Sequence, residues 1–311
     1  MKLKRNILLL FVIISKLIAK NCAVTYERNN GFFGDNLISY ISACQLVLDL
    51  QAIDPSCNID LLYAPFPYSD QLMLHTFGKE YTKETALKYK NIIYYDKNNA
   101  HTYTPTQDTL YITTWVNRPV PNFHDKDLRD LVKKTLSPKN KIKRIEKPKN
   151  YVSVACHVRR GGGFEKKEEH MPARKPLQFV PLHYYRDQIE RLLELYPRKK
   201  IYVHIFTDDK NPEKIVAYFT ENINSKWIEY GYRKEHNAHD QNVLDDFFNM
   251  IDFQVIIRPR SNFSKLAEYL GNHEIRIIPA SYSFIKGDNN WRIDHIQISL
   301  PCRVDKKKSI Y

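Results

Sequence analysis

The sequence predicts an α/β protein with parallel sheets, built as one large or two medium-sized domains. The chain has 311 residues, which exceeds the usual size of a single domain. Short β-branched runs alternate with stretches of helical apolar spacing, a pattern typical of βαβ units. The lysine-rich segment 138–150 carries two prolines and separates two groups of such elements. We therefore expect an N-terminal domain over residues 23–137, a basic linker over 138–150 and a C-terminal domain over 151–311.

Residues 1–22 have the composition of a targeting segment. A basic start, Met1–Arg5, precedes an apolar run from Ile7 to Ile14, and small residues follow near Ala23. The run is shorter than a membrane span, and Lys16 would be costly at the centre of a bilayer. We expect a signal peptide or weak membrane anchor, and hence a membrane-associated or exported protein. The alternative is a buried first strand or helix in a cytoplasmic protein.

The N-terminal half shows one strand, a glycine-containing turn and then alternating elements. The strand is expected at residues 23–26, the turn at Gly31–Asn36 and a long helix at 37–52. Glycines between a first strand and a first helix let an anion approach the helix N-terminus, although most such turns are only turns. Further along, the pattern predicts strands at 58–63, 91–95 and 109–115, and helices at 69–78 and 125–136.

The stretch Tyr151–Gly163 begins as a buried strand and ends in two arginines and three glycines. Arginine offers planar, bidentate donors to phosphate oxygens, and glycines let backbone N–H groups approach a ligand closely. This combination favours a phosphate site at the end of the strand. The alternative is an ordinary turn with surface arginines.

The C-terminal half continues the alternation of strands and helices. The pattern predicts helices at 182–195, 213–220, 242–250 and 265–270, and strands at 200–206, 253–257 and 275–279. Asp208 and Asp209 follow one strand, and the turn from Arg258 to Ser264 follows another. Ligands of open α/β sheets bind outside the carboxyl ends of strands, so these polar clusters are candidates for a site. Acidic residues that cap the next helix are the alternative for Asp208 and Asp209.

The charge balance favours an anionic partner. There are 48 Lys and Arg against 35 Asp and Glu, a net charge of +13. Such an excess suits nucleic acid, anionic lipid or a diphosphate-bearing small molecule. No recognised nucleic-acid motif is present, and residues 133–149 alone hold eight basic residues, so we do not expect a nucleic-acid partner.

Neither the cysteines nor the histidines indicate a metal site. The five cysteines lack zinc-type spacing. A Cys44–Cys57 disulfide is compatible with the sequence, but nothing in the sequence specifically indicates it. His236, His239 and Asp240 are spaced like metal ligands, but a polar loop is the simpler interpretation. We expect no bound metal and no cofactor.

Several short motifs together resemble the fucosyltransferases that act at α-1,2 and α-1,6 positions or on protein hydroxyls. His157-Val-Arg-Arg160 resembles their His-x-Arg-Arg motif, and Phe206–Asp209 resembles the acidic pair that ends a later strand. The late helix and Ser-x-Phe-Ser turn of these enzymes are similar to Asp245–Met250 and Ser261–Ser264. The turn Gly31–Asn36 is similar to their N-terminal Gly-x-x-Gly-Asn-Gln. The matches occur in the order of the family, from residue 31 to about 270.

The resemblance implies two Rossmann-like domains that face each other across a cleft, the GT-B arrangement. It also implies transfer of fucose with inversion, from GDP-fucose held mainly by the second domain to a glycan hydroxyl, without an obligatory metal. Arg159 would stabilise the charge on the leaving β-phosphate, Arg160 would aid orientation, and His157 would form part of the pocket wall. The remaining substrate-binding residues would be Gly31, Gly34, Asn36, Asp209, Ser261, Asn262, Phe263 and Ser264.

The chain departs from the family pattern at two positions. Gly162 stands where the family often has an acid, and Asp35 stands where it has an asparagine. We take Asp35 as a candidate catalytic base for the acceptor hydroxyl; a helix N-cap is its alternative role. Two other functions remain open: a glycosyltransferase that uses a different nucleotide sugar, and a binding protein that has lost catalysis on the same scaffold.

Overall fold

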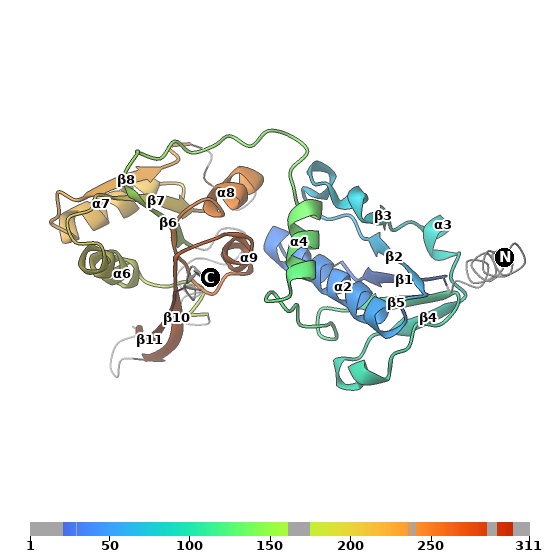
Figure 1. Cartoon of the computed structure of the whole chain (residues 1–311). Helices are drawn as coiled ribbons and strands as arrows, with labels where there is room; N and C mark the ends of the chain where they lie inside the picture. Colours follow the sequence, from blue (N-terminus) through green and yellow to red (C-terminus); the bar gives the residue numbers. More distant parts are fainter. Residues whose placement is uncertain are drawn as a thin grey trace, which may run out of the picture. The chain divides into compact units, whose positions relative to one another are not determined.

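The computed structural model describes residues 21–28, 30–160, 175–235, 237, 241–284 and 291–300. The targeting segment expected within residues 1–20 and the glycines at 161–163 lie outside the described residues. So do His236, His239 and Asp240. The chain forms two compact units that divide between Lys141 and Ile142, inside the lysine-rich segment 138–150 (Figure 1).

Unit 1 is built on a five-stranded parallel sheet with strand order β3-β2-β1-β5-β4. Its strands are β1 (Asn21–Tyr26), β2 (Asn58–Tyr63), β3 (Gly78–Glu80), β4 (Asn91–Tyr94) and β5 (Thr109–Thr113). Its helices are α2 (Phe33–Ile53), α3 (Lys83–Ala86) and α4 (Lys126–Thr135), with 3-10 turns η1 (Ser69–Gln71), η2 (Leu74–Thr76) and η3 (Lys97–Thr102). The first strand therefore lies at the centre of the sheet, where it contacts β2 on one side and β5 on the other.

Helix α2 forms much of the core of unit 1. It packs against β1, β2 and α4, and most of its side chains are buried, among them Leu37, Ile41 and Leu50. Within the described residues, α2 is also long and apolar enough to cross a membrane by length and composition. Because its side chains pack into the unit, burial in a protein core accounts for this composition.

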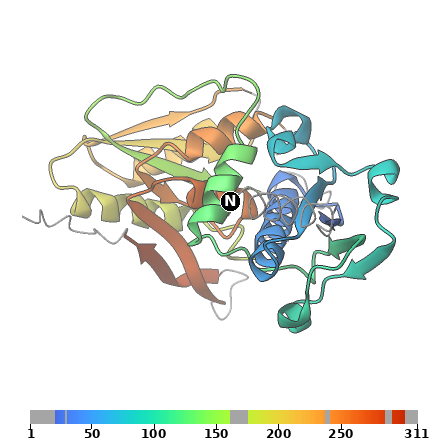
Figure 2. The same ribbon diagram turned by 45° about the vertical axis from the view of Figure 1, so that its right-hand side comes forward.

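Unit 2 contains a six-stranded sheet with order β11-β10-β9-β6-β7-β8, in which β11 alone runs antiparallel to its neighbour. The strands are β6 (Val152–Val158), β7 (Ile201–Thr207), β8 (Ile228–Tyr232), β9 (Val255–Ile257), β10 (Ile275–Phe284) and β11 (Trp291–Ser299). Helices α6 (Leu182–Leu195) and α7 (Pro212–Asn222) cover one face, and α8 (Val243–Met250) and α9 (Asn262–Leu270) cover the other (Figure 2). The central strand β6 is thus buried on both faces.

The alternation of side chains along β6 assigns each residue to one of these two faces. Val154, Cys156 and Val158 join the core formed with α6 and α7. His157 points to the opposite face, where its ring lies 5.8 Å from that of Phe263 on α9. A seven-residue strand with every residue buried fits the prediction from its continuous apolar run.

The prediction of an α/β protein with two parallel-dominated sheets is confirmed. The helix predicted at 69–78 is wrong. This segment forms η1, η2 and β3. Its internal backbone bonds close only short turns, such as Leu72 N to Ser69 O, while Met73 N donates to Ser137 O and Lys139 N donates to Gln71 O. Strands β8 and β11 were not predicted, and β10 continues five residues beyond the strand predicted at 275–279.

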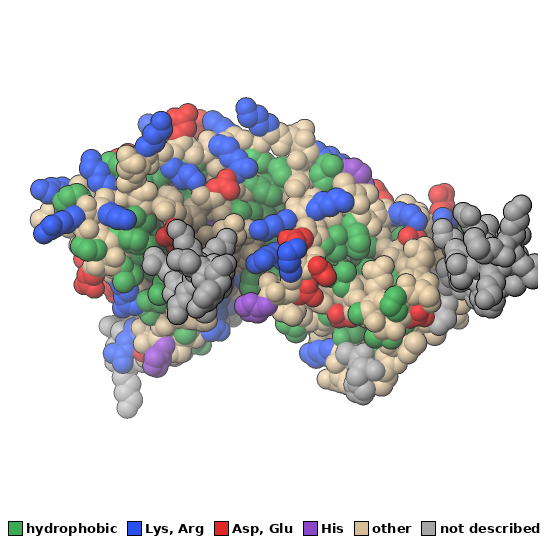
Figure 3. Space-filling view, in the orientation of Figure 1, with side chains coloured by type: hydrophobic (Ala, Val, Ile, Leu, Met, Phe, Trp, Pro, Cys, Tyr) green, Lys and Arg blue, Asp and Glu red, His purple; other side chains and the backbone are tan. Residues whose placement is uncertain are grey.

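Basic side chains are not confined to the linker region. On the displayed face, Lys and Arg are spread over the surface of both units (Figure 3).

The first residues after the division of the chain are bound to α8. Lys143 N donates to Asp245, and Ile145 N donates to the Asn249 side chain at 2.9 Å.

Candidate functional site

The loops that follow the neighbouring strands β6 and β9 both begin at the carboxyl edge of the unit 2 sheet. From β6 the sheet continues through β7 and β8 on one side and through β9 and β10 on the other. Loops that leave neighbouring strands at such a reversal of strand order diverge and leave a crevice in which ligands of α/β proteins bind. The residues at this place are Arg159 and Arg160, after β6, and the turn from Arg258 to Ser261, after β9.

Arg159 is held at the start of helix α9. Its Nη1 donates to Ser261 Oγ over 3.5 Å, and its guanidinium carbon lies 5.3 Å from the centre of the Phe179 ring. The side chain is half-buried, and the cation–π contact restrains the planar group. A fixed guanidinium beside a helix N-terminus is suited to bind a diphosphate.

The first turn of α9 carries two serine hydroxyls that do not cap it. Ser261 occupies the N-cap position without a side-chain capping bond, and Ser264 Oγ is buried with no hydrogen-bond partner among the described residues. The first N–H groups of a helix lack intrahelical acceptors, and an unsatisfied buried hydroxyl costs about 1–3 kcal/mol. An anion at this helix end would give these donors an acceptor.

His157 forms a neutral wall beside this helix end. Burial lowers the pKa of His157 to about 3, with further lowering by Arg159 and Arg258. The imidazole is therefore uncharged at neutral pH, and its Nδ1 is buried without a partner among the described residues. Because Arg258 is paired with Glu268, the guanidinium of Arg159 is what gives the surroundings of this histidine their positive charge.

Arg160 is bound to a different part of the sheet from Arg159. Its backbone N–H donates to Asp208 Oδ1 over 2.7 Å, and its Nε lies 3.6 Å from Asp209 Oδ2. Asp209 also accepts a bond from Asn211 N just before α7. The acidic pair after β7 thus anchors the Arg160 backbone and the start of α7.

A buried ion pair sets the position of the turn between β9 and α9. Arg258 and Glu268 are 6% and 7% exposed, and the Arg258 Nε donates to the Glu268 carboxylate. Removing one partner of such a pair typically costs about 3–5 kcal/mol. The sequence analysis predicted neither the ion pair of Arg258 and Glu268 nor the contact of Phe179 with Arg159. The Arg-Pro-Arg turn was the available signal for Arg258, whereas neither Phe179 nor Glu268 stands in a local motif.

The predicted residues of unit 1 lie in the turn and first helical residues after β1. Asn36 Nδ2 donates to Gly31 O at 2.7 Å and to Phe32 O at 3.2 Å, so this side chain closes the turn. Phe32 is the N-cap of α2, and Gly34 is buried in the first turn. Asp35 lies in the same turn, so its alternative role as N-cap is wrong.

The loop after β5 contributes a cation near Asp35. β5 lies next to β1 in the sheet, and Arg118 stacks over the Trp115 ring with its guanidinium carbon 3.9 Å from the ring centre. Burial lowers the pKa of Arg118, and the negative charge of Asp35 partly opposes this. Asp35, Arg118 and Trp115 form a second polar cluster, at the carboxyl edge of unit 1.

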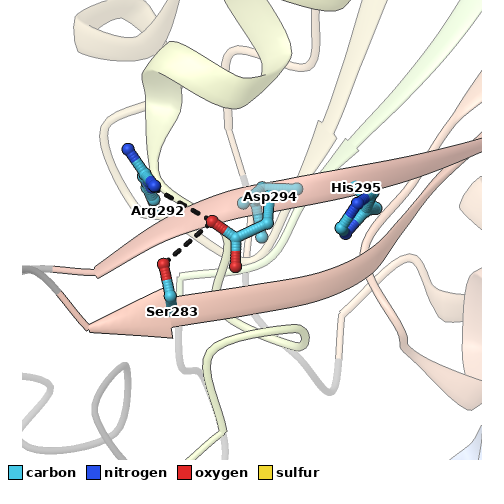
Figure 4. Close-up of a pocket in the computed structure, with 5 residues that line it drawn as sticks. Ser283, Arg292, Asp294 and His295 are labelled. Atoms are coloured by element: carbon cyan, nitrogen blue, oxygen red, sulfur yellow. Dashed lines mark hydrogen bonds and ion pairs between the residues drawn. The ribbon is translucent and has the colours of Figure 1, made fainter.

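The β10–β11 hairpin holds a surface depression that contains none of the predicted site residues. It is lined by Ser283, Arg292, Ile293, Asp294 and His295 (Figure 4). The Asp294 carboxylate accepts bonds from Ser283 Oγ at 2.8 Å and Arg292 Nε at 3.0 Å. These bonds satisfy one carboxylate oxygen within the hairpin itself. Across the described residues, no group of three or more His, Cys, Asp or Glu is placed to hold a metal ion.

Solved structures of fucosyltransferases share this fold. The NodZ α-1,6-fucosyltransferase, in a crystal soaked with GDP-fucose, aligns over 90% of this chain and 99% of its own, with a TM-score of 0.51 and 11% identity. A mutant of Arabidopsis thaliana FUT1 in complex with GDP aligns over 84% of this chain and 71% of its own, also with a TM-score of 0.51 and 11% identity. No protein-family model matches the sequence. No curated protein matches it either.

Proposed function

We propose that this chain is an inverting glycosyltransferase that transfers fucose from GDP-fucose to a glycan hydroxyl, with the donor bound by unit 2. The observation that carries this proposal is the contact between Arg159 and Ser261 at the N-terminus of α9, at the reversal of strand order. The fold shared with fucosyltransferases that bind GDP-fucose or GDP supports the choice of donor.

The chemistry required of unit 2 is stabilisation of the leaving GDP. As the bond to the sugar carbon breaks, negative charge grows on the β-phosphate. In this proposal Arg159 donates to that phosphate, and the first amides of α9 supply further donors without a metal ion. Ser264 and His157, whose Oγ and Nδ1 are buried without partners among the described residues, would gain polar neighbours. The buried Arg258–Glu268 pair keeps the turn in place.

The acceptor hydroxyl needs a base, and Asp35 is our candidate. It lies in the first turn of α2 at the carboxyl edge of the unit 1 sheet, where the N-terminal ends of helices and strand-end loops present polar groups. In the proposed mechanism its carboxylate takes the acceptor proton while the hydroxyl attacks the sugar carbon. Residues 1–20 would direct the protein to a membrane or secretory compartment, where glycan acceptors are found.

The first experiment compares binding of GDP, UDP, GDP-fucose and GDP-mannose by thermal shift and calorimetry. We expect GDP and GDP-fucose to raise the Tm, and Arg159→Ala to abolish most of this shift. Arg186→Ala is the matched control, because Arg186 pairs with Asp187 on α6, on the other face of the sheet. No response to any nucleotide would overturn the proposal, and a preference for UDP would assign a different donor.

The second experiment separates catalysis from binding. GDP release from GDP-fucose is measured in the presence of EDTA, with mixed glycans or water as acceptor. We expect release to continue in EDTA and to fall about 10²–10³-fold in Arg159→Ala. GDP binding without any release would instead identify a binding protein on the glycosyltransferase scaffold.

A further inference from the structure

Two buried cysteines of unit 1 lie side by side. Cys22 is in β1, and Cys57 immediately precedes β2; their Sγ atoms are 3.1 Å apart, although the residues are 35 positions apart in sequence. Both side chains are almost fully buried, at 1% and 3% exposure. Cys44 is buried on α2, where burial raises the pKa of its thiol to about 12. Among the described cysteines, Cys156 belongs to unit 2.

The pairing of the central strands produces this contact. β1 and β2 are parallel neighbours, with Asn21 opposite Asn58 and Cys22 opposite Ile59. Residues two apart on a strand point to the same face, so Cys57 and Ile59 share the face of Cys22. Side-chain rotation would need to close the sulfur separation by about 1 Å to reach a disulfide bond length of about 2.05 Å.

We propose that Cys22 and Cys57 form a disulfide when the chain folds in the presence of a disulfide oxidant, such as oxidised glutathione or a protein disulfide oxidase. Each thiol loses one proton, one S–S bond forms, and the two electrons reduce the oxidant's disulfide to two thiols. The bond would tie the central strand of unit 1 to its neighbour. This inference does not depend on the proposed sugar transfer.

The burial of the pair determines when the reaction takes place. Burial, together with the neighbouring Cys57 thiol, raises the pKa of Cys22 far above its usual range. The thiolate is the attacking species, so oxidation in the folded protein is slow and the bond forms before β1 is fully buried. Once formed, the buried bond is shielded from reductants. The redox state of the pair therefore records the environment in which the chain folded.

The proposal also constrains processing of the N-terminus. The sequence places the end of the targeting segment at residue 22, whereas β1 begins at Asn21 and Cys22 is paired within the sheet. Cleavage after residue 22 would remove one partner of the disulfide. We therefore infer that any cleavage occurs before Cys22, so that the mature chain retains this thiol.

The test is cell-free synthesis of the full chain with either oxidised glutathione or dithiothreitol. The soluble product is denatured in unlabelled N-ethylmaleimide, reduced, and labelled with deuterated N-ethylmaleimide before peptide mass spectrometry. With oxidised glutathione we expect the heavy label on Cys22 and Cys57 and the light label on Cys44 and Cys156. The oxidised product should also unfold roughly 5–10 °C above the reduced one.

Two variants serve as controls. Cys44→Ser is expected to keep the heavy label on Cys22 and Cys57, whereas Cys57→Ser is expected to give the light label on Cys22. A light label on both Cys22 and Cys57 of the soluble wild-type product made with oxidised glutathione would overturn the proposal. A bond between Cys57 and Cys44 would overturn it as well. Because the labelling is read on the wild type, the conclusion does not depend on either variant being stable.

Discussion

The guanidinium of Arg159 lies 3.5 Å from the hydroxyl of Ser261, although 102 positions separate the two residues in sequence. The pairing of β6 with β9, with Cys156 opposite Ile257, brings them together. One residue supplies a fixed positive charge, and the other stands at the start of a helix. Their proximity is the basis of the proposed phosphate site, from which most of the following predictions derive.

The shape of the Arg159 side chain should matter as well as its charge. We expect Arg159→Lys to weaken GDP binding about tenfold or more, because an ammonium group cannot reproduce the bidentate contact of a guanidinium with phosphate. Calorimetric titration with GDP measures the change. Arg186→Lys on α6 should leave the Kd unaltered. An Arg159→Lys protein with unchanged affinity for GDP would show that only the charge is used.

Ser264→Ala should separate stability from binding. Its hydroxyl is buried without a partner among the described residues, so its removal should leave the free energy of unfolding unchanged or raise it by up to about 1 kcal/mol. GDP binding should weaken about fivefold to tenfold, as expected for one hydrogen bond to a charged group. Urea unfolding and calorimetry give the two values.

Ser153→Ala is the matched control for that substitution. Ser153 Oγ accepts a bond from Gln254 N at 3.2 Å, so its loss should cost about 1 kcal/mol of stability and leave GDP binding unaffected. If Ser264→Ala instead lost stability and kept full affinity, its hydroxyl would be a structural group.

Asp35→Asn tests the proposed base. We expect GDP release from GDP-fucose to slow by at least about 10²-fold, since positioned acid–base groups contribute about 10²–10⁴-fold, while the Kd for GDP stays within about twofold. Asp130→Asn is the control, because Asp130 pairs with Lys126 on the surface of α4. Undiminished release by Asp35→Asn would remove this residue from the mechanism.

His157 should make unit 2 less stable in acid. Its pKa is about 3 in the folded protein, because of burial and two arginines, against about 6.5 in an unfolded chain. Between these pH values the unfolded chain binds the additional proton, so stability falls as the pH decreases from about 6.5. At pH 5 the loss from this one group is about 2 kcal/mol, at 1.4 kcal/mol per pH unit.

Urea unfolding at pH 7 and pH 5 measures this dependence. We expect His157→Asn to reduce the loss of stability between the two pH values. His204→Asn should have a similar effect, because burial and Arg233 lower the pKa of His204 to about 3. A His157→Asn protein with the full wild-type dependence would show that this histidine does not carry it.

Much of the fold was visible in local sequence patterns. The long apolar run predicted β6, helical spacing predicted α6 over Leu182–Leu195, and the pattern predicted β2 over Asn58–Tyr63, each close to its observed bounds. These elements were predictable because periodicity reports which side of an element is buried. Strand β8 escaped prediction because Gly231 interrupts it. A Cβ at this position would lie 2.0 Å from the Tyr202 hydroxyl, so the strand needs a glycine there. No local sequence pattern reveals this need, because Tyr202 lies on the neighbouring strand.

The sequence by itself therefore determined the α/β class, most of the elements and the residues from which a phosphate site can be built, because these follow from local periodicity and side-chain chemistry. Tertiary structure alone decided that Arg159 meets Ser261, that Arg160 turns to Asp208 and Asp209, and that Cys57 lies beside Cys22. The physical reason is that strand order and register bring together residues far apart in the chain, and sequence spacing carries no record of that order.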